Sequence, residues 1–378
     1  MEPRIIATAA KVGNVIERVL AAFRPGRHGQ TVRTLRIVPH RSLGDGTTLT
    51  VCGRVIQEAT TRHRRPRRTG AVPAREHLAA VYRAFDVAEL PSARVEVSYD
   101  AQRRIAQCDP LGFFSVDVPA PRGHCWRGGQ HTAHVRLLDA ASVLATPADS
   151  ATHAVPAQVF VPGTHATLVI VSDLDDTAMD TNTLSMLSSI ATVMFRSARR
   201  RRPVPGVPAL YRALQAGAYG HAENPVCYIS SGAWNLYDAV VDYLDTHDMP
   251  HGSILLNDWG SRRRGFHAVA HAHKALHVSR LLARLPTMPF LLIGDDVQED
   301  PEIYFDVARA HPGRIAAIWI RELRHSGKRR RSIDAMRAPL AAVGTDLVVA
   351  ADTAHFVADA TFRDWIQPSH GAPTAANR

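Results

Sequence analysis

The 378-residue chain has little cysteine, few aromatic residues and no long apolar run. Its four cysteines are scattered, and no two of them stand at the CxxC spacing of a metal or redox motif. This excludes a disulfide framework and fits a reducing compartment best. No run approaches the roughly 18 apolar residues of a membrane-spanning helix, and the N-terminus lacks the apolar core of a signal peptide. We therefore predict a cytoplasmic protein, soluble or peripheral at a membrane surface.

Positive charge is the strongest compositional bias, with a formal net charge of +10. Such a charge attracts polyanions, either an anionic phospholipid surface or nucleic acid, and charge alone does not separate the two. Aromatic residues make up only 6% of the chain and are not interleaved with the basic runs, as a base-stacking surface would require. The basic runs lie at residues 62–68, 199–202, 262–264 and 328–331.

The first half of the sequence is typical of short strands separated by Gly, Pro and Asp. We expect an N-terminal helical arm over residues 1–35 and a β-rich, sandwich-like accessory domain over residues 36–160, whose protein partner the sequence does not identify. Strands are predicted at residues 47–55, 93–99, 112–118 and 131–138, and one amphipathic helix at residues 74–85. This half contains no group of residues that indicates chemistry.

The second half alternates short apolar runs with helical stretches. The Ala-, Pro-, Thr- and Ser-rich residues 145–165 predict a strand-poor connector, followed by a second domain over residues 165–367. Continuously apolar strands between helices indicate an α/β fold with a parallel sheet buried on both faces. Ligands of such sheets bind at the carboxyl ends of the strands. The predicted strands are residues 166–171, 226–229, 290–293, 315–320 and 347–350.

Acidic residues follow the first of these strands directly, in the order Asp173, Leu174, Asp175, Asp176, Thr177. A packed core does not tolerate three carboxylates without a cation or hydrogen-bond donors. Two carboxylates at i and i+2 leave the strand on the same side. One can therefore attack phosphorus while the other protonates the leaving oxygen, which makes Asp173 and Asp175 the candidate catalytic pair.

Candidate phosphate-binding residues come next along the chain. Ser230 and Ser231 end the second apolar run and offer hydroxyl groups and backbone amides to a phosphoryl oxygen. Lys274, in a helical stretch, can neutralise charge on a transferring phosphoryl group. Two histidine pairs four residues apart surround this lysine, a spacing that can also bind zinc if the pairs share a face.

A second acidic group follows the strand at residues 290–293 and includes Asp295, Asp296 and Asp300. Hard oxygen ligands of this kind favour Mg²⁺ over zinc or copper. Without a divalent ion these carboxylates would repel one another and an incoming phosphate, so the sequence predicts a Mg²⁺ cofactor. The predicted metal ligands are Asp173, Asp175, Asp295 and Asp300.

The ordered motifs DxDxT at 173–177, Ser230, Lys274 and GDxxxxD at 294–300 resemble the haloacid-dehalogenase-like superfamily. That resemblance implies a Rossmann-like parallel sheet, Asp173 as nucleophile, Asp175 as general acid and base, and Ser230 and Lys274 as phosphate ligands. It also implies that Asp295 binds Mg²⁺ and that Asp300 supports the metal site. Because related ATPases and dehalogenases usually lack an acid at i+2, Asp175 favours a phosphatase.

The segments VSDLDDTAMDTN, YISSGAWNLYDAV, LLNDWG, LIGDDVQEDPEIY and GRIAAIWIRE are similar to the actin-patch-associated phosphatidate phosphatase family, over residues 167–322. This narrower resemblance implies Mg²⁺-dependent conversion of phosphatidate to diacylglycerol through a phosphoryl-aspartate. Asp296 replaces the small residue expected after the motif aspartate and would add negative charge near a headgroup. Trp234 and Tyr237 are candidates for the substrate entrance.

Two other functions stay open at this stage. The same chemistry could act on a nucleic-acid 3′-phosphate or on a soluble phosphomonoester, since the positive charge suits polynucleotides equally well. Alternatively, the chain could be a noncatalytic adaptor with a vestigial acidic pocket. The complete set of Asp173, Asp175, Lys274 and Asp295 argues against the adaptor.

Overall fold

A computed structural model describes seven stretches of the chain. They are residues 32–60, 87–90, 92–138, 153–174, 203–257, 266–323 and 326–367. The helix predicted at residues 74–85, most of the predicted N-terminal arm and Asp175 lie outside these stretches.

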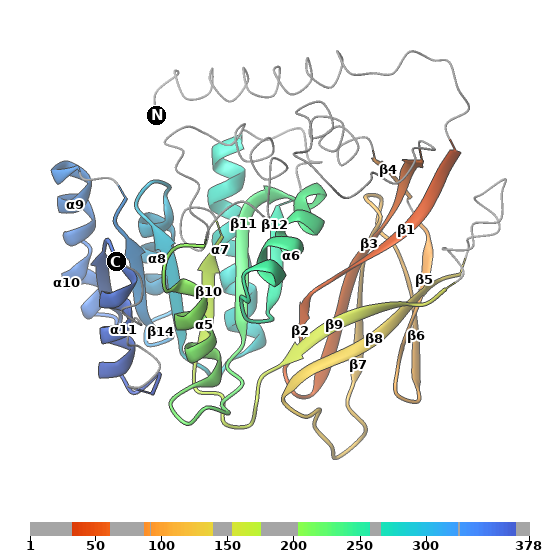
Figure 1. Ribbon diagram of the computed structural model, residues 1–378, viewed down its shortest axis with the longest axis horizontal. Helices are drawn as coiled ribbons and strands as arrows, with labels where there is room; N and C mark the ends of the chain where they lie inside the picture. Colours follow the sequence, from red (N-terminus) through yellow and green to blue (C-terminus); the bar gives the residue numbers. More distant parts are fainter. Residues whose placement is uncertain are drawn as a thin grey trace, which may run out of the picture.

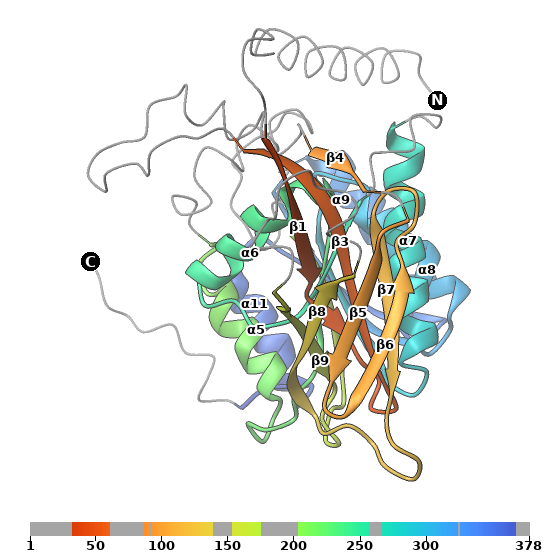
Figure 2. The ribbon, with the colours of Figure 1, turned by 90° about the vertical axis from the view of Figure 1, so that its right-hand side faces the viewer.

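The N-terminal part, which we call the β-rich half, consists of two sheets that share one core (Figure 2). In one sheet β3 lies between β1 and β4 and also pairs with β7, and the other has the order β2-β9-β8-β5-β6. Alternate side chains of each sheet point into the shared core, for example Val51 of β3 and Val135 of β8. The strands are β1 (Val32–His40), β2 (Ser42–Leu43), β3 (Thr48–Thr60), β4 (Val87–Glu89), β5 (Arg94–Tyr99), β6 (Gln102–Gln107), β7 (Phe113–Pro119), β8 (Gly129–Leu137) and β9 (Val155–Val161).

Four strands of this half, β3, β5, β7 and β8, coincide with the predicted ones, but two expectations need correction. Strand β1 begins at Val32, so the last four residues of the predicted arm belong to a strand. Strand β9 lies inside the stretch predicted to be a strand-poor connector. Its Ala157, Val159 and Val161 are fully buried in the shared core, but small residues and a proline obscure this alternation in the sequence.

The C-terminal part, the α/β half, is built on a six-stranded parallel sheet in the order β12-β11-β10-β13-β14-β15. Five strands were predicted, and the edge strand β12 was not. The strands are β10 (Val169–Asp173), β11 (Val226–Ala233), β12 (Ser253–Asn257), β13 (Phe290–Asp295), β14 (Ile315–Arg321) and β15 (Asp346–Ala350). The helices are α5 (Val207–Ala216), α6 (Tyr237–Thr246), α7 (Phe266–Arg284), α8 (Asp300–Ala310), α9 (Gly327–Asp334), α10 (Arg337–Ala341) and α11 (Thr353–Phe362), with a 3-10 turn, η2 (Trp234–Leu236).

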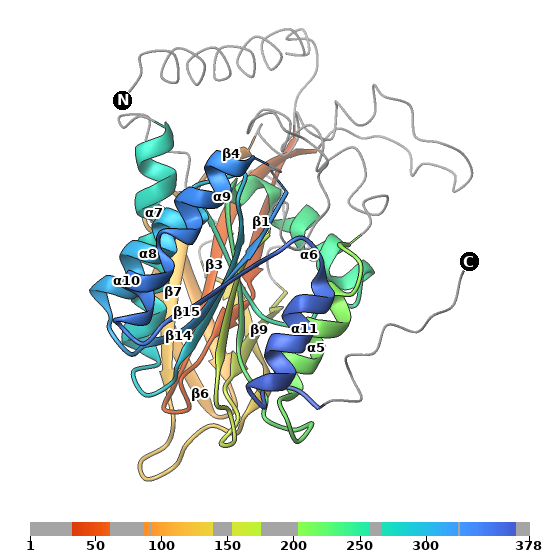
Figure 3. The ribbon, with the colours of Figure 1, turned by 90° about the vertical axis from the view of Figure 1, so that its left-hand side faces the viewer.

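Helices cover both faces of this sheet, as its apolar strands predict. Helices α5, α6 and α11 pack on one face and α7, α8 and α10 on the other (Figure 3). Every residue of strands β10 and β13 is buried. Burial on both faces explains why these strands are continuously apolar up to the residue at which each ends.

The two halves are packed together along β1, β2 and β3 (Figure 1). Val38 and Ile56 join the core on the α6 face of the parallel sheet, and Leu43 and Phe160 join the core on the α7 face. The backbone N–H of Ile254 in β12 donates to the carbonyl of Arg41, 3.1 Å away. The β-rich half therefore covers the β12 edge of the parallel sheet. No helix among the described residues is long and apolar enough to cross a membrane.

Candidate active site

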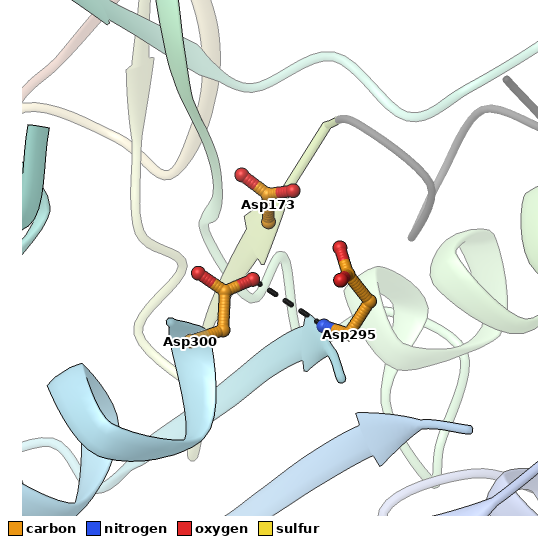
Figure 4. A group of neighbouring side chains, drawn as sticks. All are labelled: Asp173, Asp295 and Asp300. Atoms are coloured by element: carbon orange, nitrogen blue, oxygen red, sulfur yellow. Dashed lines mark hydrogen bonds between the residues drawn. The ribbon is translucent and has the colours of Figure 1, made fainter. Parts of the chain in front are cut away.

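Three carboxylates meet where the order of the parallel sheet reverses. From β10 the chain continues to β11 on one side and later returns to β13 on the other, and such a switch point is where parallel sheets bind ligands. Asp173 ends β10, Asp295 ends β13 and Asp300 begins α8. One oxygen from each carboxylate lies within 4.8 Å of the others, and all three residues are fully buried (Figure 4). We call these three residues the aspartate cluster.

Backbone groups orient two members of the aspartate cluster. Oδ1 of Asp295 accepts the N–H groups of Val297 and Gln298, at 2.7 and 3.0 Å. Oδ2 of Asp300 accepts the N–H of Asp295 at 3.3 Å, the bond drawn in Figure 4. Gly294 makes this approach possible, because a Cβ at that position would lie 2.6 Å from both Cβ and Oδ2 of Asp300. The cluster is thus fixed by the loop between β13 and α8.

Lys274 of α7 connects two of the carboxylates. Its Nζ lies 2.7 Å from Oδ1 of Asp173 and 2.5 Å from Oδ1 of Asp300, and the side chain is 3% exposed. Burial alone would lower the pKa of Lys274, but the carboxylates of Asp173 and Asp300 outweigh it and hold the pKa well above its usual value. The lysine is therefore a permanent cation that lies between the carboxylates of Asp173 and Asp300.

One ammonium does not balance three buried carboxylates, and Asp295 shows the imbalance. Burial, with the nearby charge of Asp300, raises the pKa of Asp295 to about 7, although Lys274 and the loop amides act in the opposite direction. A divalent cation would remove this cost. Since all the ligand atoms are carboxylate oxygens, the cluster suits a hard ion, in agreement with the acidic pattern of the sequence.

Ser230 and Ser231 lie beside the cluster, on the neighbouring strand. Asp173 pairs in register with Ile229. Ser230 and Ser231 are the next two residues of β11, so they lie at the same end of the sheet as Asp173. Both are buried, and Oγ of Ser230 accepts the N–H of Gly232 at 2.9 Å. The strand predicted to end at Ile229 runs on to Ala233 with an irregular register. We call residues 230–232 the serine segment.

The three predicted entrance residues have structural contacts. Trp234 stacks on the ring of His40 in the β-rich half, and Tyr237 is 6% exposed with its hydroxyl oxygen accepting the N–H of Arg41 at 2.7 Å. Asp296 is 2% exposed, and its Oδ1 accepts the N–H of Leu323 at 2.8 Å. The carboxylate of Asp296 thus ties the loop after β13 to the end of β14. An entrance role for these residues stays a prediction.

The histidine spacing that suggested zinc gives one close pair. The Nε2 atoms of His273 and His277 are 2.7 Å apart, at hydrogen-bonding distance. Burial and the neighbouring His273 lower the pKa of His277 to about 3, so its ring is neutral. Within the described stretches, the aspartate cluster is the one group of three metal-binding side chains. His267 and His271 belong to the residues whose side chains are not described.

Two contributors to the site had no role assigned to them from the sequence. Gly294 creates the space for Asp300, and Arg321 ends β14 opposite Asp295 in register. Arg321 is 5% exposed and donates to the carbonyl of Ala351 at 3.3 Å and to Oγ1 of Thr353 at 3.2 Å, which fixes the start of α11 beside the site. The available signal for Arg321 was a charged residue at the end of an apolar run.

Comparison with known proteins gives one family. Residues 168–322 match the family model described as "Phosphatidate phosphatase APP1, catalytic domain". The chain is 25% identical over 153 residues to phosphatidate phosphatase APP1 of Saccharomyces cerevisiae, and 24% identical over 155 residues to an uncharacterized protein of Schizosaccharomyces pombe. These matches cover 40% and 41% of this chain and 25% of each relative, so the chain spans about a quarter of the length of the curated relatives it matches.

Among solved structures, a carbohydrate acetylesterase from Xanthomonas citri is 13% identical, with 85% of this chain and 69% of that chain covered. Its TM-score is 0.30, which supports no argument about fold or function.

Proposed function

We propose that the chain is a Mg²⁺-dependent phosphatase, because its residues 168–322 match the family model of the APP1 phosphatidate phosphatase catalytic domain. Its substrate in this proposal is phosphatidate, which it hydrolyses to diacylglycerol and phosphate as a phosphoric monoester hydrolase. The observation that carries the proposal is the meeting of Asp173, Lys274 and Asp295 at one switch point of a parallel sheet. That arrangement also supports a haloacid-dehalogenase-like fold for the α/β half.

The aspartate cluster would hold the Mg²⁺ ion, together with Asp175, the fourth predicted ligand. When bound, the ion supplies positive charge that stabilises the negative charge of the transferring phosphoryl group. The buried oxygens of the cluster fit such an ion, because the raised pKa of Asp295 shows that their own charges are not balanced.

The proposed reaction has two displacements at phosphorus, with Asp173 as the nucleophile of the first and the leaving group of the second. First, the carboxylate of Asp173, which lies beside the ammonium of Lys274, attacks phosphorus, and the bond from phosphorus to the diacylglycerol oxygen breaks while Asp175 gives that oxygen its proton. Then Asp175 takes a proton from water, the resulting hydroxide displaces Asp173 from phosphorus, and phosphate leaves. Lys274 and Ser230 bind the phosphoryl oxygens in both steps, where developing charge needs donors.

The proposed location follows from the substrate. Phosphatidate is a membrane lipid, so the protein would work at an anionic membrane surface as a peripheral cytoplasmic protein. The formal net charge of +10 supports this binding, because basic side chains are attracted to anionic lipids. The same charge also favours a second candidate, removal of a 3′-phosphate from nucleic acid by the same chemistry.

A substrate comparison tests the proposal. Phosphate release is measured from phosphatidylcholine vesicles containing phosphatidate, from 3′-phosphorylated DNA and from an aryl phosphate, each with Mg²⁺ and with a chelator. We expect Mg²⁺-dependent release, fastest from the vesicles, and none above background from the variant Asp173→Asn, which cannot form the phosphoryl-aspartate. If phosphate is released from the DNA but from neither of the other two substrates, and the release is sensitive to salt, the substrate is a nucleic-acid end. Near wild-type turnover by Asp173→Asn would refute the covalent route.

A further inference from the structure

The residues directly after the serine segment are held by the β-rich half, not by the α/β half alone. The ring of His40 in β1 stacks on Trp234, with centroids 3.9 Å apart and planes 13° from parallel. The ring of Phe113 in β7 meets the same Trp234 at 62°, with centroids 5.7 Å apart. Two residues separate Trp234 from Ser231, so these rings fix the chain where it leaves the phosphate-binding edge.

Polar contacts continue this attachment through the next residues. Nη1 of Arg54 in β3 donates to Oδ1 of Asn235 at 3.3 Å, and its Nε donates to the carbonyl of Leu111 at 2.9 Å. The backbone N–H of Arg41 donates to the hydroxyl oxygen of Tyr237 at 2.7 Å. Contacts from β1 and β3 thus reach Trp234, Asn235 and Tyr237 within four residues of the chain.

The α/β half buries the serine segment and Leu236, but it does not pair the serine segment in regular register with β12. The register between β11 and β12 is irregular between Ile229 and Ala233, so regular sheet pairing does not fix the serine segment. The 3-10 turn η2 and helix α6 that follow have no side-chain cap. His40 is 4% exposed. Burial and the charge of Arg54 lower the pKa of His40 to about 3, so its stacked ring is neutral.

We propose that His40 and Arg54 are positioning residues for the phosphatase site, which hold the serine segment in its phosphate-binding conformation through Trp234 and Asn235. The β-rich half is then part of the catalytic apparatus and not only an accessory module. The expected effect on kcat/KM rests on the proposed function. The expected effect on the affinity for inorganic phosphate is measured without turnover.

The test compares His40→Ala with His40→Phe in the full chain. We expect His40→Ala to weaken binding of inorganic phosphate, titrated calorimetrically in Mg²⁺, by about tenfold, the worth of one hydrogen bond to a charged group. Its kcat/KM should fall by about 10- to 100-fold, as expected when a phosphate-binding group is misplaced by about 1 Å. Mg²⁺ affinity should not change, and His40→Phe, which keeps a stacking ring, should restore phosphate binding.

A matched control separates positioning from general stability. Leu43→Ala removes a buried contact between the same two halves, on β2 and away from Trp234, and should lower the melting temperature while phosphate affinity and KM stay unchanged. If His40→Ala does not fold, Arg54→Gln replaces it, since Arg54 is partly exposed and its loss removes the contact with Asn235.

Each outcome decides the inference. Unchanged phosphate affinity in both His40→Ala and Arg54→Gln would overturn it, and so would an equal loss of Mg²⁺ affinity, which would mean general disruption of the site. If the wild type binds phosphate but hydrolyses no phosphomonoester, the proposed function fails while the phosphate titration still tests the positioning role. A wild type that binds no phosphate would overturn both.

Discussion

Gly294→Ala should disable the site without replacing any residue of the aspartate cluster. The added Cβ would lie 2.6 Å from both Cβ and Oδ2 of Asp300, whereas ordinary contacts of this kind begin at 3.4 Å. The backbone of β13 is buried and paired on both sides, so it cannot yield easily. Asp300 must therefore move away by about 0.8 Å, the difference between these two separations.

The displacement should reach both partners of Asp300. Its Oδ1 lies 2.5 Å from Nζ of Lys274, and its Oδ2 accepts the N–H of Asp295, so a shift of this size lengthens or breaks both bonds. Overpacking of a core costs about 1–3 kcal/mol of stability. A misplacement of about 1 Å in a catalytic group costs about 100-fold in rate. We expect a loss of about that size in kcat/KM, with weaker Mg²⁺ binding.

The assay measures phosphate release, calorimetric Mg²⁺ affinity and melting temperature for the same preparation. Gly327→Ala is the matched control, because its added Cβ would meet only the flexible end of Arg331, at 3.5 Å, on helix α9. It should behave as the wild type in all three measurements. The reasoning is refuted if Gly294→Ala folds and keeps both wild-type turnover and wild-type Mg²⁺ affinity.

Two further predictions concern the charges of the site. Lys274→Met leaves Asp173 and Asp300 buried without their cation, so it should lower the free energy of unfolding by about 3–5 kcal/mol, and Mg²⁺ should restore part of this loss. Denaturant titration measures the change, and Lys328→Met, which replaces an exposed lysine, is the control. Equal stability of the two variants would contradict the prediction. Because the pKa of Asp295 is about 7, Mg²⁺ must displace a proton from this carboxyl group at lower pH. The affinity of the protein for Mg²⁺ should therefore fall about tenfold per pH unit below pH 7 and stay constant above it. A calorimetric Mg²⁺ affinity that does not change from about pH 5.5 to 8 would refute the role of Asp295.

The positions of Asp173 and Asp295 were predictable because their signals are local in the sequence. Asp173 and Asp295 each follow an uninterrupted apolar run, and a parallel sheet brings the ends of such runs together. The sequence predicted Lys274 as a phosphate ligand but did not predict its contacts, since one of them is with Asp300, 26 residues later in the chain. The spacing of residues does not contain that information.

The missed features depend on contacts between distant segments. His40 reads as an ordinary residue of a strand, and only packing places its ring on Trp234, which is 194 positions later in the printed sequence. Strand β9 was missed because small residues and a proline obscure its alternation, and β12 because its apolar run covers only residues 254–256. The hydrogen bond from the backbone of Leu323 to Asp296 also joins distant segments and was not visible in the sequence.

The hydrogen bond from Ile254 to Arg41 has a practical consequence for anyone who wishes to isolate the part of the chain that matches the family model. A fragment limited to the family match, residues 168–322, would lack the terminal strand β15 and helix α11, and would leave the β12 margin without its neighbour. Both edges of the sheet would then expose unpaired backbone N–H and C=O groups and apolar side chains to other copies of the fragment, which promotes aggregation. The shortest piece expected to remain monodisperse begins before Val32 and extends past Ile366.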